Sequence, residues 1–159
     1  MRKPLASEDN MRAYLGSLDQ AYLNKVSLHG HHDLVDEFGI GGKHFKSIEE
    51  VDTHRLVSKS FHSFESIEKE PTLLTYGFLS PIYDSISKVG YKSDFNKKDL
   101  KRKLSGFDQF PIYALGGIET SKIDELLELG FDGAVLMGTI WSEENMSNRI
   151  DITDKFIHA

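Results

Sequence analysis

The chain of 159 residues contains no cysteine, so a disulfide scaffold, a thiolate metal site and a cysteine nucleophile are all excluded. It lacks any apolar run near the roughly 18 residues that a membrane helix needs, and its first ten residues lack the apolar core of a secretory signal. Positive charge is not in excess: 19 Lys and Arg against 25 Asp and Glu give a formal net charge of −6. These absences predict a cytoplasmic protein with no nucleic-acid or membrane partner, folded as one domain over residues 1–159.

Hydrophobic patterning predicts strands that alternate with helices. About six short apolar segments are expected to be strands, namely residues 26–28, 43–45, 55–60, 72–77, 111–115 and 132–137. A helix capped by Ser7 is expected before the first strand, and helical segments are expected between most of the strands, the last of them at residues 121–129. This alternation is typical of repeated βα units in a parallel sheet, either an open doubly wound sheet or a closed barrel, with function at the carboxyl ends of the strands.

Two stretches between the expected strands differ from this regular pattern. Residues 79–96 form the longest irregular stretch, and loops of that length in a compact domain are usually functional or disordered. The basic run at residues 97–103 alternates with apolar and acidic residues, which indicates a solvated helix face or, alternatively, an anionic docking surface.

Glycines follow the last two expected strands. Gly116 and Gly117 stand between a strand and a helix, and Met137-Gly138 repeats that arrangement after the last strand. Backbone N–H groups and the helix dipole at such a junction can hold a phosphate, and glycine allows its oxygens to approach closely. Two successive junctions of this kind predict a phosphate site, although each glycine could instead serve only a tight turn.

Hydroxyl, ammonium and imidazole groups follow two of the other strands. Ser85, Ser87 and Lys88 could bind successive oxygens of a diphosphate, or belong to an ordinary polar loop. His62 lies just past its strand, where a titrating group could face a ligand, although a lone histidine is more often a packing or capping residue. The histidines within residues 29–33 look like a metal cluster, but they straddle a strand end and a helix start, and no second cluster completes a coordination shell.

Together, these segments resemble the thiamine phosphate synthase and TenI family, a group of (β/α)8 barrels, over nearly the whole chain. The most specific matches are Ser85-Ile86-Ser87-Lys88, similar to the family's Thr-x-Thr/Ser-Lys loop, and Ala114-Leu115-Gly116-Gly117-Ile118, similar to its Ala-x-Gly-Gly-Ile. Further matches in the same order are residues 42–45, 57–63 and 132–140. The resemblance implies a barrel enzyme that joins a hydroxymethylpyrimidine diphosphate to a thiazole phosphate and releases diphosphate.

Site residues follow from the resemblance by position. The departing diphosphate would be held by Arg2, Ser85, Ser87 and Lys88, with Lys88 also expected to act in catalysis, and Ser60 would contact the pyrimidine side. The thiazole phosphate would be held by Gly116, Gly117, Met137 and Gly138. In TenI-type relatives, which isomerise a thiazole carboxylate phosphate, the histidine that matches His62 transfers the proton. A thiazole tautomerase and a non-catalytic phosphate-ester-binding remnant are therefore the alternatives.

Three departures from the family pattern accompany these matches. The family's Asn-Asp is His29-Gly30 here, and the second carboxylate expected to hold Mg²⁺ falls near Glu49 in a divergent local sequence. Residues 1–4 match the end of the family's second strand, so the first strand, the first helix and most of the second strand are expected to be absent. A barrel with about six strands would leave two exposed edges, through which the chain could form a homo-oligomer.

Overall fold

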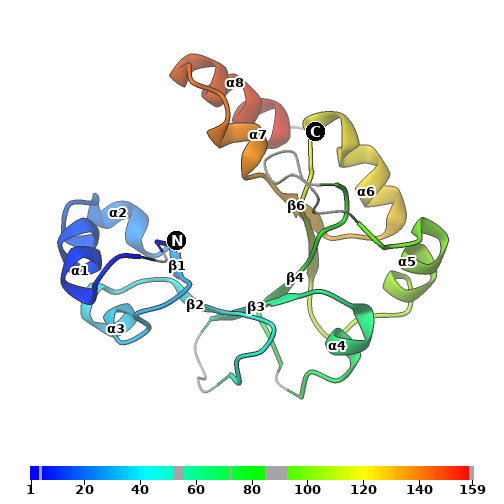
Figure 1. Ribbon diagram of the computed structural model, residues 1–159, viewed down its shortest axis with the longest axis horizontal. Helices are drawn as coiled ribbons and strands as arrows, with labels where there is room; N and C mark the ends of the chain where they lie inside the picture. The colour runs from blue at the N-terminus through cyan, green and yellow to red at the C-terminus, as the bar shows by residue number, and fades with distance from the viewer. Residues whose placement is uncertain (4, 52–55, 72, 85–92, 158–159) are drawn as a thin grey trace. The chain divides into compact units, whose positions relative to one another are not determined.

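The computed structural model describes residues 1–3, 5–51, 56–71, 73–84 and 93–157 (Figure 1). The chain divides into two compact units, residues 1–60 and residues 61–159, which are described in turn. Among the described helices, none is long and apolar enough to cross a membrane.

The first unit is built on three parallel strands, β1 (Ser27–Leu28), β2 (Gly42–Phe45) and β3 (Val57–Phe61). Phe61, the last residue of β3, belongs to the second unit. The registers of the three strands pair Leu28 with Lys43 and His44 with Ser58. Three helices accompany them: α1 (Glu8–Gly16), α2 (Gln20–Leu23) and α3 (Leu34–Phe38). As expected, Ser7 caps α1, because its side chain accepts the N–H of Asn10 at 3.2 Å.

The apolar face of α1 closes the core of this unit. Met11 and Leu15 pack there with the buried side chains of β1 and α3 and of the segments that flank them. Met1 lies beside β1, because its nitrogen donates to the carbonyl of Ser27 and its carbonyl accepts the N–H of His29 at 3.0 Å. This is the bonding pattern of a parallel neighbour, and it agrees with the match of residues 1–4 to the end of a strand.

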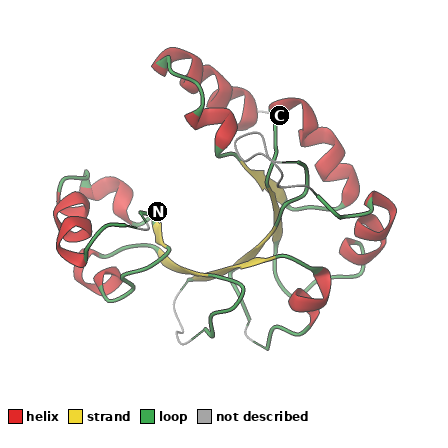
Figure 2. Cartoon of the chain, viewed as in Figure 1, coloured by secondary structure: helices red, strands yellow, loops and turns green. Residues whose placement is uncertain are grey.

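The second unit contains three further parallel strands, β4 (Tyr76–Leu79), β5 (Ile112–Leu115) and β6 (Gly133–Val135). Its helical elements are α4 (Phe64–Glu68), α5 (Lys97–Leu104), the 3₁₀ turn η1 (Thr120–Lys122), α6 (Ile123–Leu129), α7 (Gly138–Trp141) and α8 (Met146–Ile157). Figure 2 shows α4, α5 and α6 along one face of these strands. The apolar stripes of α5 and α6 face the core, because both helices bury leucines there, namely Leu100, Leu104, Leu126 and Leu129.

The six strands among the described residues confirm the α/β class expected from the sequence, with three differences in its details. The fourth strand was expected at residues 72–77 and lies at Tyr76–Leu79, because the pairing of Gly77 with Ile112 fixes its place. Helix α8 was not expected, and none of its side chains is fully buried. The basic run forms α5, whose Lys103 pairs with Glu65 at 2.9 Å and with Asp99, as a solvated helix face would.

Candidate functional site

A buried histidine joins two serines at the carboxyl end of the strands in the first unit. His44, only 2% exposed, lies near the end of β2. Its Nδ1 is 2.8 Å from the hydroxyl of Ser58, and its Nε2 is 2.8 Å from the hydroxyl of Ser60. Both serines belong to β3 at alternate positions, so they point to the same side of the strand. The predicted pyrimidine contact, Ser60, is therefore hydrogen-bonded to a buried imidazole.

A second imidazole packs on the first. The ring centroids of His29 and His44 are 4.0 Å apart. Burial, with a smaller effect of neighbouring positive charges, lowers the pKa of His44 to about 4 and the pKa of His29 to about 3. Arg2 is one of the charges that lower the pKa of His29, which places this predicted site residue near the pair. Both imidazoles are consequently neutral near pH 7, so each ring offers one N–H donor and one acceptor nitrogen.

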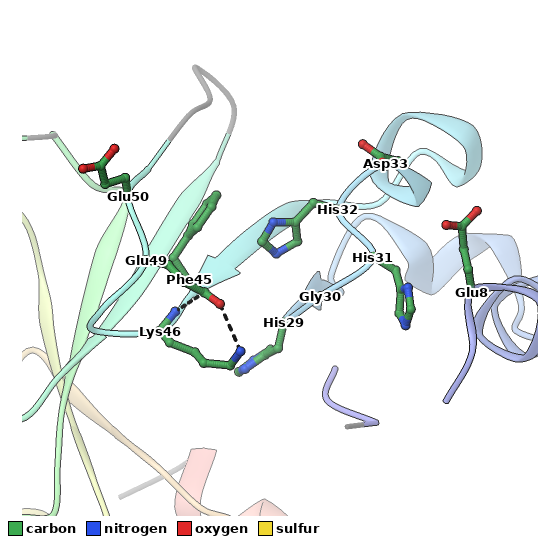
Figure 3. A pocket seen from close by; sticks show the side chains of 10 residues that line it. All are labelled: Glu8, His29, Gly30, His31, His32, Asp33, Phe45, Lys46, Glu49 and Glu50. Carbon is green, nitrogen blue, oxygen red and sulfur yellow. Dashed lines mark hydrogen bonds and ion pairs between the residues drawn. The ribbon is translucent and has the colours of Figure 1, made fainter. Parts of the chain in front are cut away.

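A pocket of about 490 Å³ opens next to His29, and Figure 3 labels the ten residues that line it. Glu49, the predicted metal ligand, lies in its wall. Its carboxylate accepts the backbone N–H of Lys46 at 2.7 Å and the Lys46 ammonium at 3.0 Å, and these bonds lower the pKa of Glu49. Within the described ranges, no three His, Asp or Glu side chains are grouped so that they could hold a metal ion. The donor set present here does not fit a magnesium site, since Mg²⁺ needs several hard oxygen ligands.

The predicted phosphate turn in the second unit packs tightly against the loop after β4. Gly116 and Gly117 have φ angles of +100° and +65°, in the left-handed region that favours glycine. A Cβ on Gly117 would lie 2.2 Å from the carbonyl oxygen of Asp84 and 2.8 Å from the Cβ of Tyr83. The carbonyl of Gly116 accepts the N–H of Tyr83 at 3.1 Å. Both the backbone conformation and the close packing therefore require glycine at 117.

The turn after β6 is joined to this glycine turn by a side chain. Helix α7 begins at Gly138, directly after Met137, and the hydroxyl of Thr139 donates to the carbonyl of Ile118. Within the described residues, the N–H groups of Gly117 and Gly138 donate to no oxygen. The structure thus brings the two predicted phosphate-binding turns together, and no oxygen of the described residues accepts either amide.

His62 follows β3 and is exposed to solvent. Its Nδ1 lies 2.9 Å from the carbonyl oxygen of Ser80, which can only accept, so Nδ1 carries a proton. The three predicted diphosphate ligands Ser85, Ser87 and Lys88 lie outside the described residues. The segment that contains them is flanked by Asp84 and Ser93, and the Ser93 N–H donates to the Asp84 carboxylate at 2.9 Å.

Two residues of the buried histidine and serine group were not predicted from the sequence as site residues. His44 and Ser58 lie within segments that match the family, and nothing in the local pattern indicated that they meet. A signal was present, because Ser58 and Ser60 alternate along a strand, and a polar residue repeated at that period faces one side.

The chain was compared with known proteins, and no family model matches it. It is 24% identical over 133 residues to a thiamine-phosphate synthase from Staphylococcus saprophyticus, and this match spans 60% of the length of that curated relative. The crystal structure of a thiamine phosphate pyrophosphorylase from Bacteroides thetaiotaomicron superposes with a TM-score of 0.82 and 26% identity, over 99% of this chain and 80% of the other.

A thiamine phosphate pyrophosphorylase from Pyrococcus furiosus superposes with a TM-score of 0.79 at 15% identity, over 99% of this chain and 81% of the other, which shows the shared fold. These comparisons confirm the resemblance: the chain is thiamine phosphate synthase-like in sequence and has the α/β barrel-type fold of those proteins.

Proposed function

We propose that the chain is a thiamine phosphate synthase-type transferase, which joins a hydroxymethylpyrimidine diphosphate to a thiazole phosphate and releases diphosphate. The observation that best supports this proposal is the pair of glycine turns in the second unit, tied by Thr139 and Ile118, with amides that donate to no described oxygen. Likeness in sequence and fold to proteins named for this activity gives the pair its expected ligand, the thiazole phosphate.

The second unit supplies the phosphate-binding groups in this proposal. The amides of Gly116, Gly117 and Gly138, with the backbone of Met137, hold the three terminal oxygens of the thiazole phosphate, because N–H groups at the end of a strand favour an anion. Lys88 holds the departing diphosphate together with Ser85 and Ser87. When diphosphate leaves with the bonding electron pair, negative charge develops on its oxygens, and fixed donors with an ammonium group stabilise that charge.

The first unit contributes the pyrimidine side. Ser60 offers a hydroxyl at the end of β3, and the neutral imidazoles of His29 and His44 lie beside it. Arg2, near His29, is proposed to contact the diphosphate. Since Glu49 is engaged by Lys46, no step of the proposed reaction is derived from a metal ion held by this chain.

The proposal is tested by incubating the protein with both precursors and Mg²⁺ and assaying thiamine phosphate. Lys88→Ala should abolish product formation, whereas Lys101→Ala, a matched change at an exposed lysine of α5, should leave it unchanged. A wild-type protein that forms no thiamine phosphate would contradict the proposal. If the protein instead isomerises a thiazole carboxylate phosphate and His62→Asn abolishes that reaction, the chain is a tautomerase.

A further inference from the structure

The bonds of His44 form a chain of three polar side chains inside the first unit. Ser58 is 1% exposed and His44 is 2% exposed, whereas Ser60 is only half-buried. Both bonds to the imidazole measure 2.8 Å, well within the range of a hydrogen bond. The chain therefore runs from the buried side of the strands to a hydroxyl that still reaches solvent.

The direction of these bonds follows from counting protons. A neutral imidazole has one N–H and one acceptor nitrogen, so it cannot donate to both serines. The buried Ser58 hydroxyl needs an acceptor, and two lie within reach among the described residues: Nδ1 of His44 at 2.8 Å and the carbonyl of Lys43 at 3.5 Å. The longer contact is at the limit of a hydrogen bond, so the hydroxyl donates to Nδ1. The ring proton then lies on Nε2 and is donated to Ser60.

We propose that His44, oriented by Ser58, is a positioning residue that makes the Ser60 hydroxyl a fixed hydrogen-bond donor toward a ligand atom that accepts, such as a ring nitrogen. The Ser60 oxygen accepts the proton of Nε2, so its own hydrogen is directed away from His44. Each bond in such a chain polarises the next, which strengthens the terminal donor. The identity of the ligand rests on the proposed function, in which Ser60 contacts the pyrimidine.

The proposal sets a selectivity at this position. An aminopyrimidine presents an unprotonated ring nitrogen to a donor, whereas its oxo analogue has an N–H at the adjacent ring nitrogen and would face the Ser60 hydroxyl with a second donor. We expect the wild-type protein to bind the amino compound at least tenfold more tightly than the oxo compound, which is the loss expected when a polar group is left unpaired. In Ser60→Ala the preference should disappear.

The bond direction is tested without any ligand by ¹⁵N NMR of the histidine side chains. We expect the His44 signal to be that of a neutral ring protonated at Nε2, and to shift toward a mixture of tautomers in Ser58→Ala. Ser105→Ala, which removes an exposed hydroxyl at the end of α5, should leave the signal in place. A wild-type ring protonated at Nδ1 would overturn the proposal.

Binding of the pyrimidine diphosphate and its oxo analogue, measured by calorimetry, tests the consequence for a ligand. Ser58→Ala should weaken binding of the amino compound by roughly tenfold and reduce the preference over the oxo compound. An unchanged preference in Ser58→Ala, or none in the wild type, would overturn the positioning role. A protein that binds neither compound contradicts the proposed function. The His44 tautomer measured by NMR then tests the direction of the hydrogen bonds on its own.

Discussion

Replacement of Gly117 by alanine is the most stringent test of the packing described for the phosphate turn. At a φ angle of +65°, an L side chain costs about 1–2 kcal/mol relative to glycine. The new Cβ would also lie 2.2 Å from the Asp84 carbonyl oxygen, so backbone must move, and overpacking of this kind costs about 1–3 kcal/mol. The two effects together predict a loss of about 2–5 kcal/mol in the free energy of unfolding.

Urea denaturation followed by circular dichroism measures this loss, which should lower the midpoint by about 1–2 M. Two controls in the same unit separate the causes. Gly130→Ala has a φ of +97° but a nearest neighbour at 3.3 Å, and should lose about 1–2 kcal/mol. Gly106→Ala, with its nearest atom at 3.9 Å, should change stability by less than about 0.5 kcal/mol. If Gly117→Ala is no less stable than Gly130→Ala, the contact with the loop after β4 does not constrain the turn.

Three further predictions concern the remaining interactions. The pKa of His44 is lower in the folded protein than its ordinary 6.5, so the unfolded chain binds a proton more readily as the pH falls. The free energy of unfolding should therefore drop by about 1 kcal/mol or more between pH 7 and pH 5. In urea titrations at several pH values, His44→Asn should reduce this drop. Thr139→Val removes the bond to Ile118 and should weaken binding of thiazole phosphate about three- to tenfold in calorimetry, without a comparable loss of thermal stability. Tyr83→Phe removes the 2.7 Å bond to Glu125 and should lower the unfolding free energy by about 1 kcal/mol at pH 7. The effect should be smaller in acid, below the pKa of Glu125, which its bonds to Lys97 and Tyr83 lower.

Much of the fold could be predicted because its signals are local. The Ser7 cap marks the start of α1, and the apolar spacing of residues 121–129 marks α6 with its 3₁₀ entry. The position of β4 is not a local property, because residues 72–77 are apolar enough for a strand and only pairing with β5 selects Tyr76–Leu79. Helix α8 was missed because none of its side chains is fully buried, and the partly buried ones at positions 149, 152, 153 and 156 include an arginine and a threonine, so its apolar stripe is weak.

In the candidate site too, local features were predicted and long-range contacts were not. The Gly116-Gly117 turn was predicted from adjacent residues, whereas the link between His44 and its serines spans 14 and 16 positions and depends on the register of β2 against β3. A shift of that register by one residue would turn the serines to the opposite face of the sheet. Pairing of parallel strands is set by the whole sheet, so the alternation of Ser58 and Ser60 could not show which residue of β2 they meet.

Gly117 is required by packing as well as suited to an anion site. Contact with Tyr83 and Asp84 and a positive φ angle demand glycine at 117 whether or not a ligand binds, so the residue type by itself indicates packing. Support for phosphate binding comes instead from the amides of Gly117 and Gly138, which donate to no described oxygen, and from the Thr139 bond that ties their turns. Polar groups left unpaired at the end of a strand are disfavoured unless water or a ligand satisfies them. A Thr139 variant that keeps both glycines therefore tests phosphate binding more directly than any glycine replacement does.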